Sequence, residues 1–490
     1  MKVCLIIPPK VEGKYVHRED KHVSMHNEPF VPYTGPLLYS LIEQEVENVE
    51  LSLIEAQRDN LNLNEALKKL DKINPDIVVC LIGWISIPWD RKLAETKYPT
   101  IAIILQQWLN QLEAVAQYKL KNKYTLYKEI EAPLVESLIE FQKNGVINNA
   151  AGVIIENNGK YNLTSVGNLY DIKKLPLPNF KIFKLEKYFE LREKHLPKEM
   201  AKVGYLNTMK SCSYKCAFCG QANDGTTRVR YQTASYVVSQ LEYLSKEYGI
   251  EKFIFIDNLF TLSKRRAKEF CKDLIKSNIN IKYSVNDRTG YFDDEILSLL
   301  KKSGCYEIRI GIETVESHLQ EYLNKKIDIK NAIEQIKLVK KHGIKVQLYF
   351  TPGIPGETKK SLRMNAKFIS DCDAENFTTG PLFVMPDTQL YNKLKEEGLL
   401  YSDKWEDYRN QSELVYRNKT YKNAAEIKES ELYMRKRVYL YNMIKINRGF
   451  TYIRKNFLFY LFQFKIFRDF IRKSPDYIRS YIEKITDFKR

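Results

Sequence analysis

The feature that most constrains the fold is a strand and helix alternation that repeats through the middle of this 490-residue chain. Apolar runs of strand length recur six times, at 203–208, 252–256, 281–286, 306–312, 345–351 and 377–384. Amphipathic helical patterns separate them, for example from Ala234 to Tyr248 and from Lys264 to Ser277. Such units in series predict a partial (β/α) barrel, whose chemistry lies at the carboxyl ends of its strands.

The first part of the chain alternates in the same way. Strands are predicted at 2–7, 50–54, 76–82 and 100–105, with helices near 36–46 and 63–72. This spacing predicts a parallel sheet with helices on both faces, as in Rossmann-like domains. We expect its ligand crevice beyond the carboxyl ends of the strands, near Pro8-Pro9, Glu55-Ala56 and Gly83-Trp84.

An extended linker, Leu175-Pro176-Leu177-Pro178, separates the two patterns. We therefore expect domains at 1–180 and 190–410, followed by a helical region at 411–490 that is both basic and aromatic. That last region suits either packing on the core or peripheral contact with a membrane. Packing is favoured because burial of an aromatic face stabilises by several kcal/mol.

The composition adds limits on location and partners. The formal charge is +17, which would attract nucleic acid, anionic lipid or an acidic substrate, but a lysine-rich solvated surface explains it equally well. We do not expect nucleic acid as a partner. The chain shows no charged-then-apolar leader before its first strand and no apolar run long enough to span a bilayer, so we expect a cytoplasmic protein.

Three of the eight cysteines fall within eight positions, directly after the first barrel strand. Cys212, Cys216 and Cys219 have the spacing C-x3-C-x2-C, which can ligate three of the four irons of one cubane cluster and leave the fourth iron open. A structural zinc site requires four ligands, and the next cysteine, Cys271, lies in a helical pattern. We therefore predict that these three cysteines bind a catalytic [4Fe-4S] cluster.

This spacing, with Phe218 before the last cysteine, resembles the signature of the radical S-adenosylmethionine (SAM) superfamily. The resemblance implies that the amino and carboxylate groups of SAM chelate the open iron. It also implies that an electron from the reduced cluster cleaves SAM to methionine and a 5′-deoxyadenosyl radical. Phe218 then belongs to the predicted cofactor site.

The next strand ends supply further residues that match the superfamily. Asp257 and Asn258 follow the second strand, where the family contacts the SAM amino group, although a turn that caps the next helix is the common alternative. Arg288 follows the third strand, where a guanidinium group can bind a carboxylate. We predict that all three bind SAM.

The fourth and fifth strands continue the resemblance. Gly311-Ile312-Glu313 resembles the family's Gly-x-Glu stretch, in which the carboxylate accepts from the ribose hydroxyls, and Lys325 lies where relatives place a cation for the SAM carboxylate. Gly353 and Gly356 lie in a turn that lets the backbone approach adenosine. The resemblance covers about residues 200 to 400.

With the first domain included, the chain resembles the subclass of radical SAM enzymes that has a cobalamin (B12)-binding domain. That subclass includes methyltransferases and the anaerobic magnesium-protoporphyrin ester cyclase group. Two departures leave cobalamin binding open: Gln106-Gln107 replaces the usual Gly-Gly pair, and the segment 128–136 lacks the usual Gly-Glu-x-Glu turn. The alternative is a vestigial domain that shields the barrel and shapes the substrate pocket.

The predicted fold is thus α/β, with a cobalamin-binding-like Rossmann domain, a partial (β/α)6 radical SAM barrel and a helical C-terminal region. The predicted function is radical chemistry, either C-methylation or cyclisation and rearrangement, on an unidentified hydrophobic small molecule. The resemblance implies a reductant such as flavodoxin or ferredoxin. The sequence assigns no catalytic side chain.

Three alternatives remain at this stage. One is a radical SAM enzyme without B12, and another is a tRNA-modifying radical SAM enzyme, although the first domain lacks the extra cysteine triplet that tRNA methylthiotransferases use. The third is a non-enzymatic Fe–S or zinc module that recruits a partner.

Overall fold

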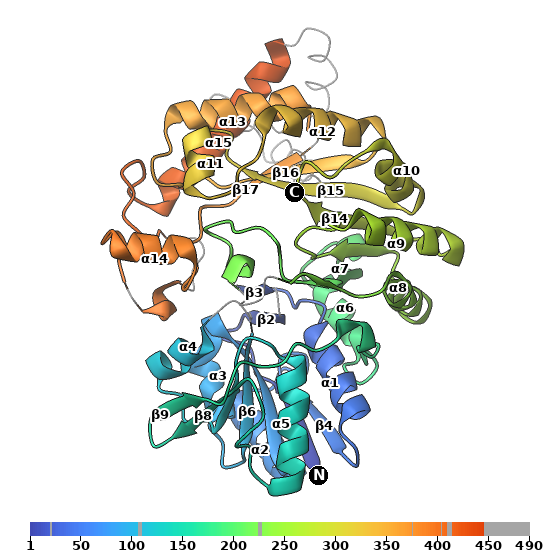
Figure 1. The fold of residues 1–490 in the computed structure, drawn as a ribbon, viewed down its shortest axis with the longest axis vertical. Coiled ribbons are helices and arrows are strands. Elements are labelled where there is room, and N and C mark those ends of the chain that lie inside the picture. The colour runs from blue at the N-terminus through green and yellow to red at the C-terminus, as the bar shows by residue number, and fades with distance from the viewer. Residues whose placement is uncertain are drawn as a thin grey trace, which may run out of the picture.

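The computed structural model describes residues 1–19, 22–105, 110–223, 228–374, 376–402, 404–408 and 414–444. Two large parallel sheets dominate it, one from each half of the chain. In Figure 1 the first domain lies below and the second sheet with its helices lies above. The pair Gln106-Gln107 and the basic aromatic stretch after residue 444 lie outside the described residues.

The first sheet has the strand order β4-β1-β5-β6-β7-β8-β9. Its strands are β1 (Lys2–Ile7), β4 (Glu50–Glu55), β5 (Ile77–Gly83), β6 (Thr100–Leu105), β7 (Tyr124–Leu126), β8 (Val153–Asn157) and β9 (Lys160–Leu163). Every residue of β5 and β6 is buried, which is why both strands consist of continuous apolar runs. The five strands from β4 to β7 are parallel, and β8 and β9 add an antiparallel hairpin.

Helices connect these strands and cover the sheet. They are α1 (Thr34–Glu45), α2 (Leu63–Ile73), α3 (Ile87–Ala94), α4 (Gln111–Tyr118) and α5 (Glu131–Asn144). The strand order reverses at β1, because the chain passes from β1 to β4 on one side and then to β5 on the other. A doubly wound sheet of this kind has its crevice at the reversal, between the carboxyl ends of β1 and β5.

A short hairpin fills this crevice. Its strands, β2 (Tyr15–Glu19) and β3 (His22–His26), lie between the two halves of the molecule in Figure 1. Arg18 of β2 forms a buried ion pair with Asp90 at 2.7 Å and donates to the carbonyls of the two prolines that follow β1. A Cβ atom at Gly83, which ends β5, would come within 3.1 Å of Val23, so the hairpin packs directly on the strand end.

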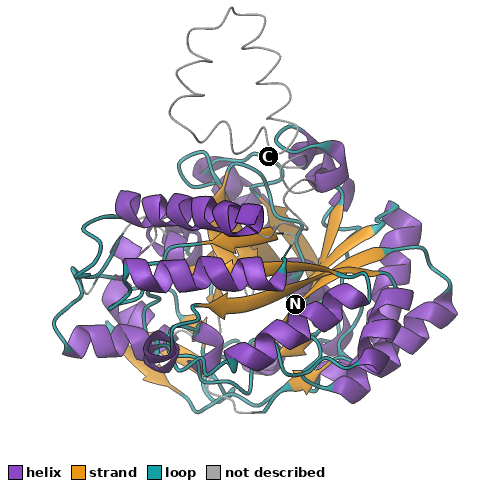
Figure 2. Cartoon of the chain, turned by 90° about the horizontal axis from the view of Figure 1, so that it is seen from above, coloured by secondary structure: helices purple, strands orange, loops and turns teal. Residues whose placement is uncertain are grey.

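The second sheet runs in chain order, β10-β13-β14-β15-β16-β17, with all neighbours parallel. Its strands are β10 (Val203–Leu206), β13 (Lys252–Phe255), β14 (Lys282–Asp287), β15 (Cys305–Glu313), β16 (Lys345–Phe350) and β17 (Asn376–Thr379). The helices between them are α8 (Ala234–Tyr248), α9 (Lys264–Ser277), α10 (Asp294–Lys302), α11 (Ser317–Tyr322), α12 (Ile329–Lys341) and α13 (Lys359–Cys372). Figure 2 shows helices around strands, and the six parallel strands in chain order with helices between them confirm the predicted partial barrel.

Two strands end two or more residues earlier than the sequence predicts, and each has a physical reason. β10 ends at Leu206 because the next N–H groups, of Thr208 and Met209, turn to the carboxylate of Asp257. β17 ends at Thr379 because Gly380 and a proline follow, and a proline has no N–H group to donate to the neighbouring strand.

Further helices join and complete the domains. α6 (Leu185–Glu193) and α7 (Lys198–Ala201) lie between the sheets, and the expected domain border at residue 190 falls within α6. α14 (Gln389–Glu396) and α15 (Ala424–Ile444) follow the barrel, and α15 packs along α13. None of the helices in the described part of the chain is long and apolar enough to cross a membrane.

Glu55 is a buried acid at the crevice of the first domain. It ends β4 and its side chain is fully enclosed. Burial raises the pKa of Glu55 to about 7, although the N–H of Arg58 and the hydroxyl of Tyr188 act in the opposite direction. The folded protein therefore holds the proton of Glu55 over a pH range in which the unfolded chain releases it.

This difference predicts a pH-dependent effect of Glu55→Gln. Between the ordinary glutamate pKa of about 4.3 and the folded value, the unfolded state binds fewer protons, so the free energy of unfolding falls as pH rises. The variant lacks this loss. From about pH 5 to about pH 8, the free energy of unfolding of the variant minus that of the wild type should rise by on the order of a few kcal/mol. Urea unfolding measures this difference. If the free energies of unfolding of the two proteins depended on pH in the same way, Glu55 would be ionised in the folded state.

Candidate active site

The three cysteines share one loop beyond the carboxyl end of β10. The loop starts after β11 (Met209–Lys210) and returns at β12 (Arg230–Tyr231). These two short strands are antiparallel, and Lys210 faces Arg230 across them. A two-stranded ribbon therefore closes the base of the cysteine loop.

The thiols of Cys212, Cys216 and Cys219 are not in disulfides and lie close enough to interact electrostatically. Burial raises the pKa of Cys219 to about 12, and the neighbouring thiols add to that rise, while Lys325 opposes it. Among the described residues no three His, Cys, Asp or Glu side chains converge on a single ion. Three adjacent thiols can each bind a different iron of one cubane cluster.

Backbone contacts with two later elements hold the loop in place. The N–H of Ala217 donates to the carbonyl of Leu323 at 2.8 Å, and the carbonyl of Ala217 accepts from the N–H of Leu390 at 2.8 Å. Asn324 donates from its side chain to the carbonyl of Lys215 at 2.6 Å. The loop is thus tied to the ends of α11 and the start of α14.

Asp257 is fully buried beneath the loop, and its carboxylate is engaged on both oxygens. Oδ1 accepts from the N–H groups of Thr208 and Met209 at 2.5 and 3.1 Å, and Oδ2 accepts from the Thr208 hydroxyl. The Arg266 guanidinium lies 3.9 Å from Oδ2. The structure thus places Asp257 against the strand that leads to Cys212.

Asn258 lies closer to the loop itself. Its side-chain NH2 donates to the carbonyl of Ser211 at 3.0 Å and to Gln221 at 3.4 Å. The amide oxygen of Asn258 is the atom that can accept from an ammonium group, since an amide nitrogen only donates.

Glu313 and Lys325 form a charged pair at the end of β15, 3.2 Å apart and largely buried. Lys325 also lies 5.9 Å from the ring of Phe218, next to the last cysteine. Glu313 adopts a left-handed backbone conformation with φ of 65°, which residues other than glycine seldom adopt. A Cβ at Gly311 would come within 2.6 Å of the Glu313 carboxylate, so a larger residue there would displace the Glu313 side chain.

Arg288 completes this group of charges. Its guanidinium donates to the carbonyls of Lys325 and Lys326, the latter at 2.7 Å, and lies 4.1 Å from the ring of Tyr214. The structure therefore brings Phe218, Arg288, Glu313 and Lys325 together beside the cysteine loop, as the sequence predicts for residues that share one ligand.

The glycine turn after β16 is held by the C-terminal region. Gly353 and Gly356 have φ of 100° and 87°, which glycine adopts without strain. The carbonyl of Gly353 accepts from the Tyr416 hydroxyl and from Asn418 at 2.7 Å. Tyr416 and Asn418 were not predicted, because no local pattern links them to a turn some sixty residues earlier.

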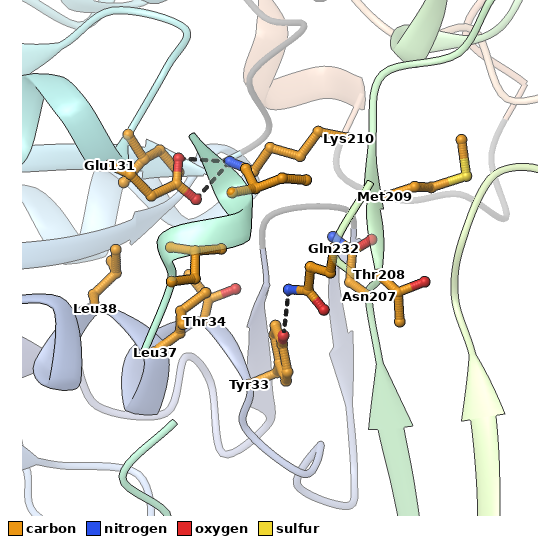
Figure 3. A pocket seen from close by; sticks show the side chains of 13 residues that line it. Tyr33, Thr34, Leu37, Leu38, Glu131, Asn207, Thr208, Met209, Lys210 and Gln232 are labelled. Carbon is orange, nitrogen blue, oxygen red and sulfur yellow. Dashed lines mark hydrogen bonds and ion pairs between the residues drawn. The ribbon is translucent and has the colours of Figure 1, made fainter. Parts of the chain in front are cut away.

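Two ion pairs join the first domain to the base of the cysteine loop. Glu131 lies 2.6 Å from Lys210, and Glu129 lies 2.5 Å from Arg230. All four side chains are nearly buried, and Figure 3 shows the first pair where α1, α5 and β11 meet. Lys128, which precedes them, has φ 60°, so it takes the left-handed turn position that glycine favours. The segment keeps its two glutamates despite the missing glycine.

The fold and its charged strand ends define an α/β enzyme in which a barrel follows a doubly wound domain along the chain. Residues 206–369 match the family model described as the radical SAM superfamily. An uncharacterized methyltransferase of Pyrococcus horikoshii is 23% identical over 83% of this chain and 86% of its own length. An anaerobic magnesium-protoporphyrin IX monomethyl ester cyclase of Rubrivivax gelatinosus is 25% identical, over 45% of this chain and 39% of its own length.

Solved structures agree on the fold. The radical SAM methyltransferase TsrM from Kitasatospora setae, with tryptophan and a SAM analogue bound, has a TM-score of 0.65 at 19% identity and covers 81% of this chain and 76% of its own. The cobalamin-dependent SAM radical enzyme OxsB has a TM-score of 0.67 at 14% identity and covers 100% of this chain and 71% of its own. The chain therefore contains a radical SAM domain and is an enzyme of the radical SAM class, with a [4Fe-4S] cluster and SAM as cofactors.

The buried interdomain pairs predict a large effect of Glu131→Gln. The substitution removes the carboxylate 2.6 Å from the buried Lys210 ammonium, and breaking a buried pair by removing one partner costs about 3–5 kcal/mol. We expect a lower midpoint of thermal unfolding. Glu136→Gln, on the same helix, is the matched control, since Glu136 accepts only a surface hydrogen bond from Asn168 and should change stability by about 0.5 kcal/mol or less. Equal midpoints for the two variants would contradict the assignment.

Proposed function

We propose that Cys212, Cys216 and Cys219 hold the cluster and that the charged group beside them binds SAM. The observation that carries this proposal is the Glu313–Lys325 pair, which lies against Phe218 with Arg288 on its other side. This edge of the barrel carries two cations, Lys325 and Arg288, and one carboxylate, Glu313. Such a set suits a ligand that carries both a carboxylate and hydroxyl groups. When bound, the reduced cluster supplies the electron that cleaves SAM and starts radical chemistry on the substrate.

Each residue has a distinct part in this proposal. Lys325 and Arg288 bind the SAM carboxylate, and Lys325 then exchanges its ion pair with Glu313 for one with the ligand. Glu313, so released, accepts from the ribose hydroxyls. Asn258 accepts from the amino group through its amide oxygen, while its NH2 group donates to the carbonyl of Ser211.

The remaining predicted residues act through the backbone. Gly353 and Gly356 let the main chain approach adenosine, because neither carries a Cβ atom. Asp257 is a positioning residue in this proposal: it fixes Thr208 and Met209, and through them the start of the cysteine loop.

The substrate proposed is a small hydrophobic molecule, and the outcome is C-methylation or cyclisation. Support comes from the names of the relatives, which include a methyltransferase and a porphyrin ester cyclase. A small redox protein of the flavodoxin or ferredoxin kind would supply the electron.

Cobalamin dependence is a second candidate, favoured by the likeness to TsrM and OxsB, which bind cobalamin. The buried pair of Arg18 and Asp90 occupies the described crevice between β1 and β5, and a cavity of about 620 Å³ lies beside it, lined in part by Asp90. We derive no chemical step through cobalamin.

The cysteine assignment predicts which thiols the enzyme needs. Cys212→Ala, Cys216→Ala and Cys219→Ala each remove one of three cluster ligands, so anaerobically reconstituted variants should lose the cluster's visible absorbance and the release of 5′-deoxyadenosine from SAM. Cys271→Ala is the control, because that thiol is buried in α9 away from the loop, and it should keep both. Loss of both signals in all four variants would place the cluster elsewhere.

Reconstitution with hydroxocobalamin tests the second candidate. With the hairpin seated in the crevice, we expect no corrin spectrum to remain after anaerobic desalting of the wild type. Retention of about one corrin per chain would instead require the hairpin to move or the cofactor to bind outside the crevice. A retained corrin that quenches the fluorescence of Trp84, at the crevice edge, would support displacement of the hairpin.

A further inference from the structure

A second pocket lies apart from the proposed SAM site. It forms where the interdomain linker at 169–173, the segment 228–234 around β12 and the first turns of α9 meet. Its volume is about 600 Å³, within the range of sites that hold small molecules. None of the residues proposed above to bind the cluster or SAM lines it.

The lining carries an excess of positive charge. Its cationic side chains are Lys173, Arg228, Arg230, Arg265 and Arg266, and its acidic ones are Asp171 and Glu269. Five cations against two acids give a formal charge of +3. Arg230 pairs with the buried Glu129, and Arg266 lies 3.9 Å from the buried Asp257. The pairing of Arg265 with Glu269 is 3.5 Å long and exposed. Exposed pairs of this kind are weak and are screened by salt.

Arg266 is the least compensated of these cations. Its side chain is only 6% exposed, yet Nε and Nη1 have no hydrogen-bond partner, and Nη2 alone donates, to Thr208. The nearest carboxylate, Asp257 at 3.9 Å, already accepts from Thr208 and Met209. Burial lowers the pKa of Arg266, as expected for a cation whose contacts in the protein do not fully replace its lost hydration.

Two long helices direct their N-termini at the same pocket. Thr233 caps α8, which has 15 residues, and Ser263 caps α9, which has 14, and both caps are part of the lining. The partial positive charge at a helix N-terminus favours an anion, most of all when N–H groups and basic side chains converge on it. The ring of Tyr231, 5.5 Å from the Arg266 guanidinium, adds a flat apolar wall.

We propose that this pocket binds a small organic phosphate, separately from SAM. Phosphate groups match guanidinium donors and helix N-termini, and the volume leaves room for the organic part against Tyr231 and Tyr170. Because Arg230 and Thr208 flank the cysteine loop, a ligand here would stiffen the base of that loop.

The test is isothermal titration calorimetry on the cluster-replete protein, with SAM present at saturation so that the charged group beside the cysteines is occupied. The probes are ADP, pyrophosphate and orthophosphate at matched ionic strength. We expect one saturable ADP site, with affinity reduced about tenfold or more in Arg228→Gln/Arg265→Gln. Both arginines are exposed and outside the proposed catalytic machinery, so the variant should fold normally.

The matched control is Lys359→Gln/Arg363→Gln, two exposed cations on α13. It should leave the ADP affinity unchanged. Equal weakening by both double variants, or no saturable binding of any probe, would overturn the proposal. Affinity for orthophosphate equal to that for ADP would overturn the assignment to an organic phosphate. Since binding is the readout, these outcomes are independent of whether SAM is cleaved.

Discussion

Two buried ion pairs between the domains hold the base of the cysteine loop, and the site is built outward from them. Glu131 and Glu129 of the first domain bind Lys210 and Arg230, which face each other across the ribbon that closes the loop. Such pairs add little net stability, since the desolvation of the charges offsets their attraction. Their effect is geometric: both ends of the loop are fixed to one rigid helix start, so the first domain takes part in placing the thiols.

The rim of the barrel shows the same dependence on fixed geometry. Glu313 is held in a left-handed conformation next to a glycine that leaves room for its carboxylate, and Lys325 meets it there. Strained backbone of this kind persists where the surroundings enforce it, often at functional sites. Beneath it, Asp257 takes up the N–H groups of the residues that lead to Cys212. The cysteine loop is thus supported from the barrel and from the first domain at once.

The sequence predicted most of the secondary structure, because parallel strands buried on both faces are apolar throughout, as in β5 and β6. It also predicted that Arg288, Glu313 and Lys325 lie together, since strand ends of one barrel share an edge. It missed the hairpin of β2 and β3, whose polar strands follow no simple alternation. It missed the pairs of Glu131 and Glu129 because their partners lie 79 and 101 residues away, and local patterns do not encode such distances.

The central claim is that three thiolates hold a cluster with one open iron and that SAM binds to this iron beside Lys325. Electron paramagnetic resonance of the reduced, cluster-replete protein before and after addition of SAM tests it most directly. The account predicts that SAM shifts the g-values of the reduced cluster, because its amino and carboxylate groups replace solvent on the open iron. An unchanged spectrum in a sample shown by equilibrium dialysis to be saturated with SAM would contradict it.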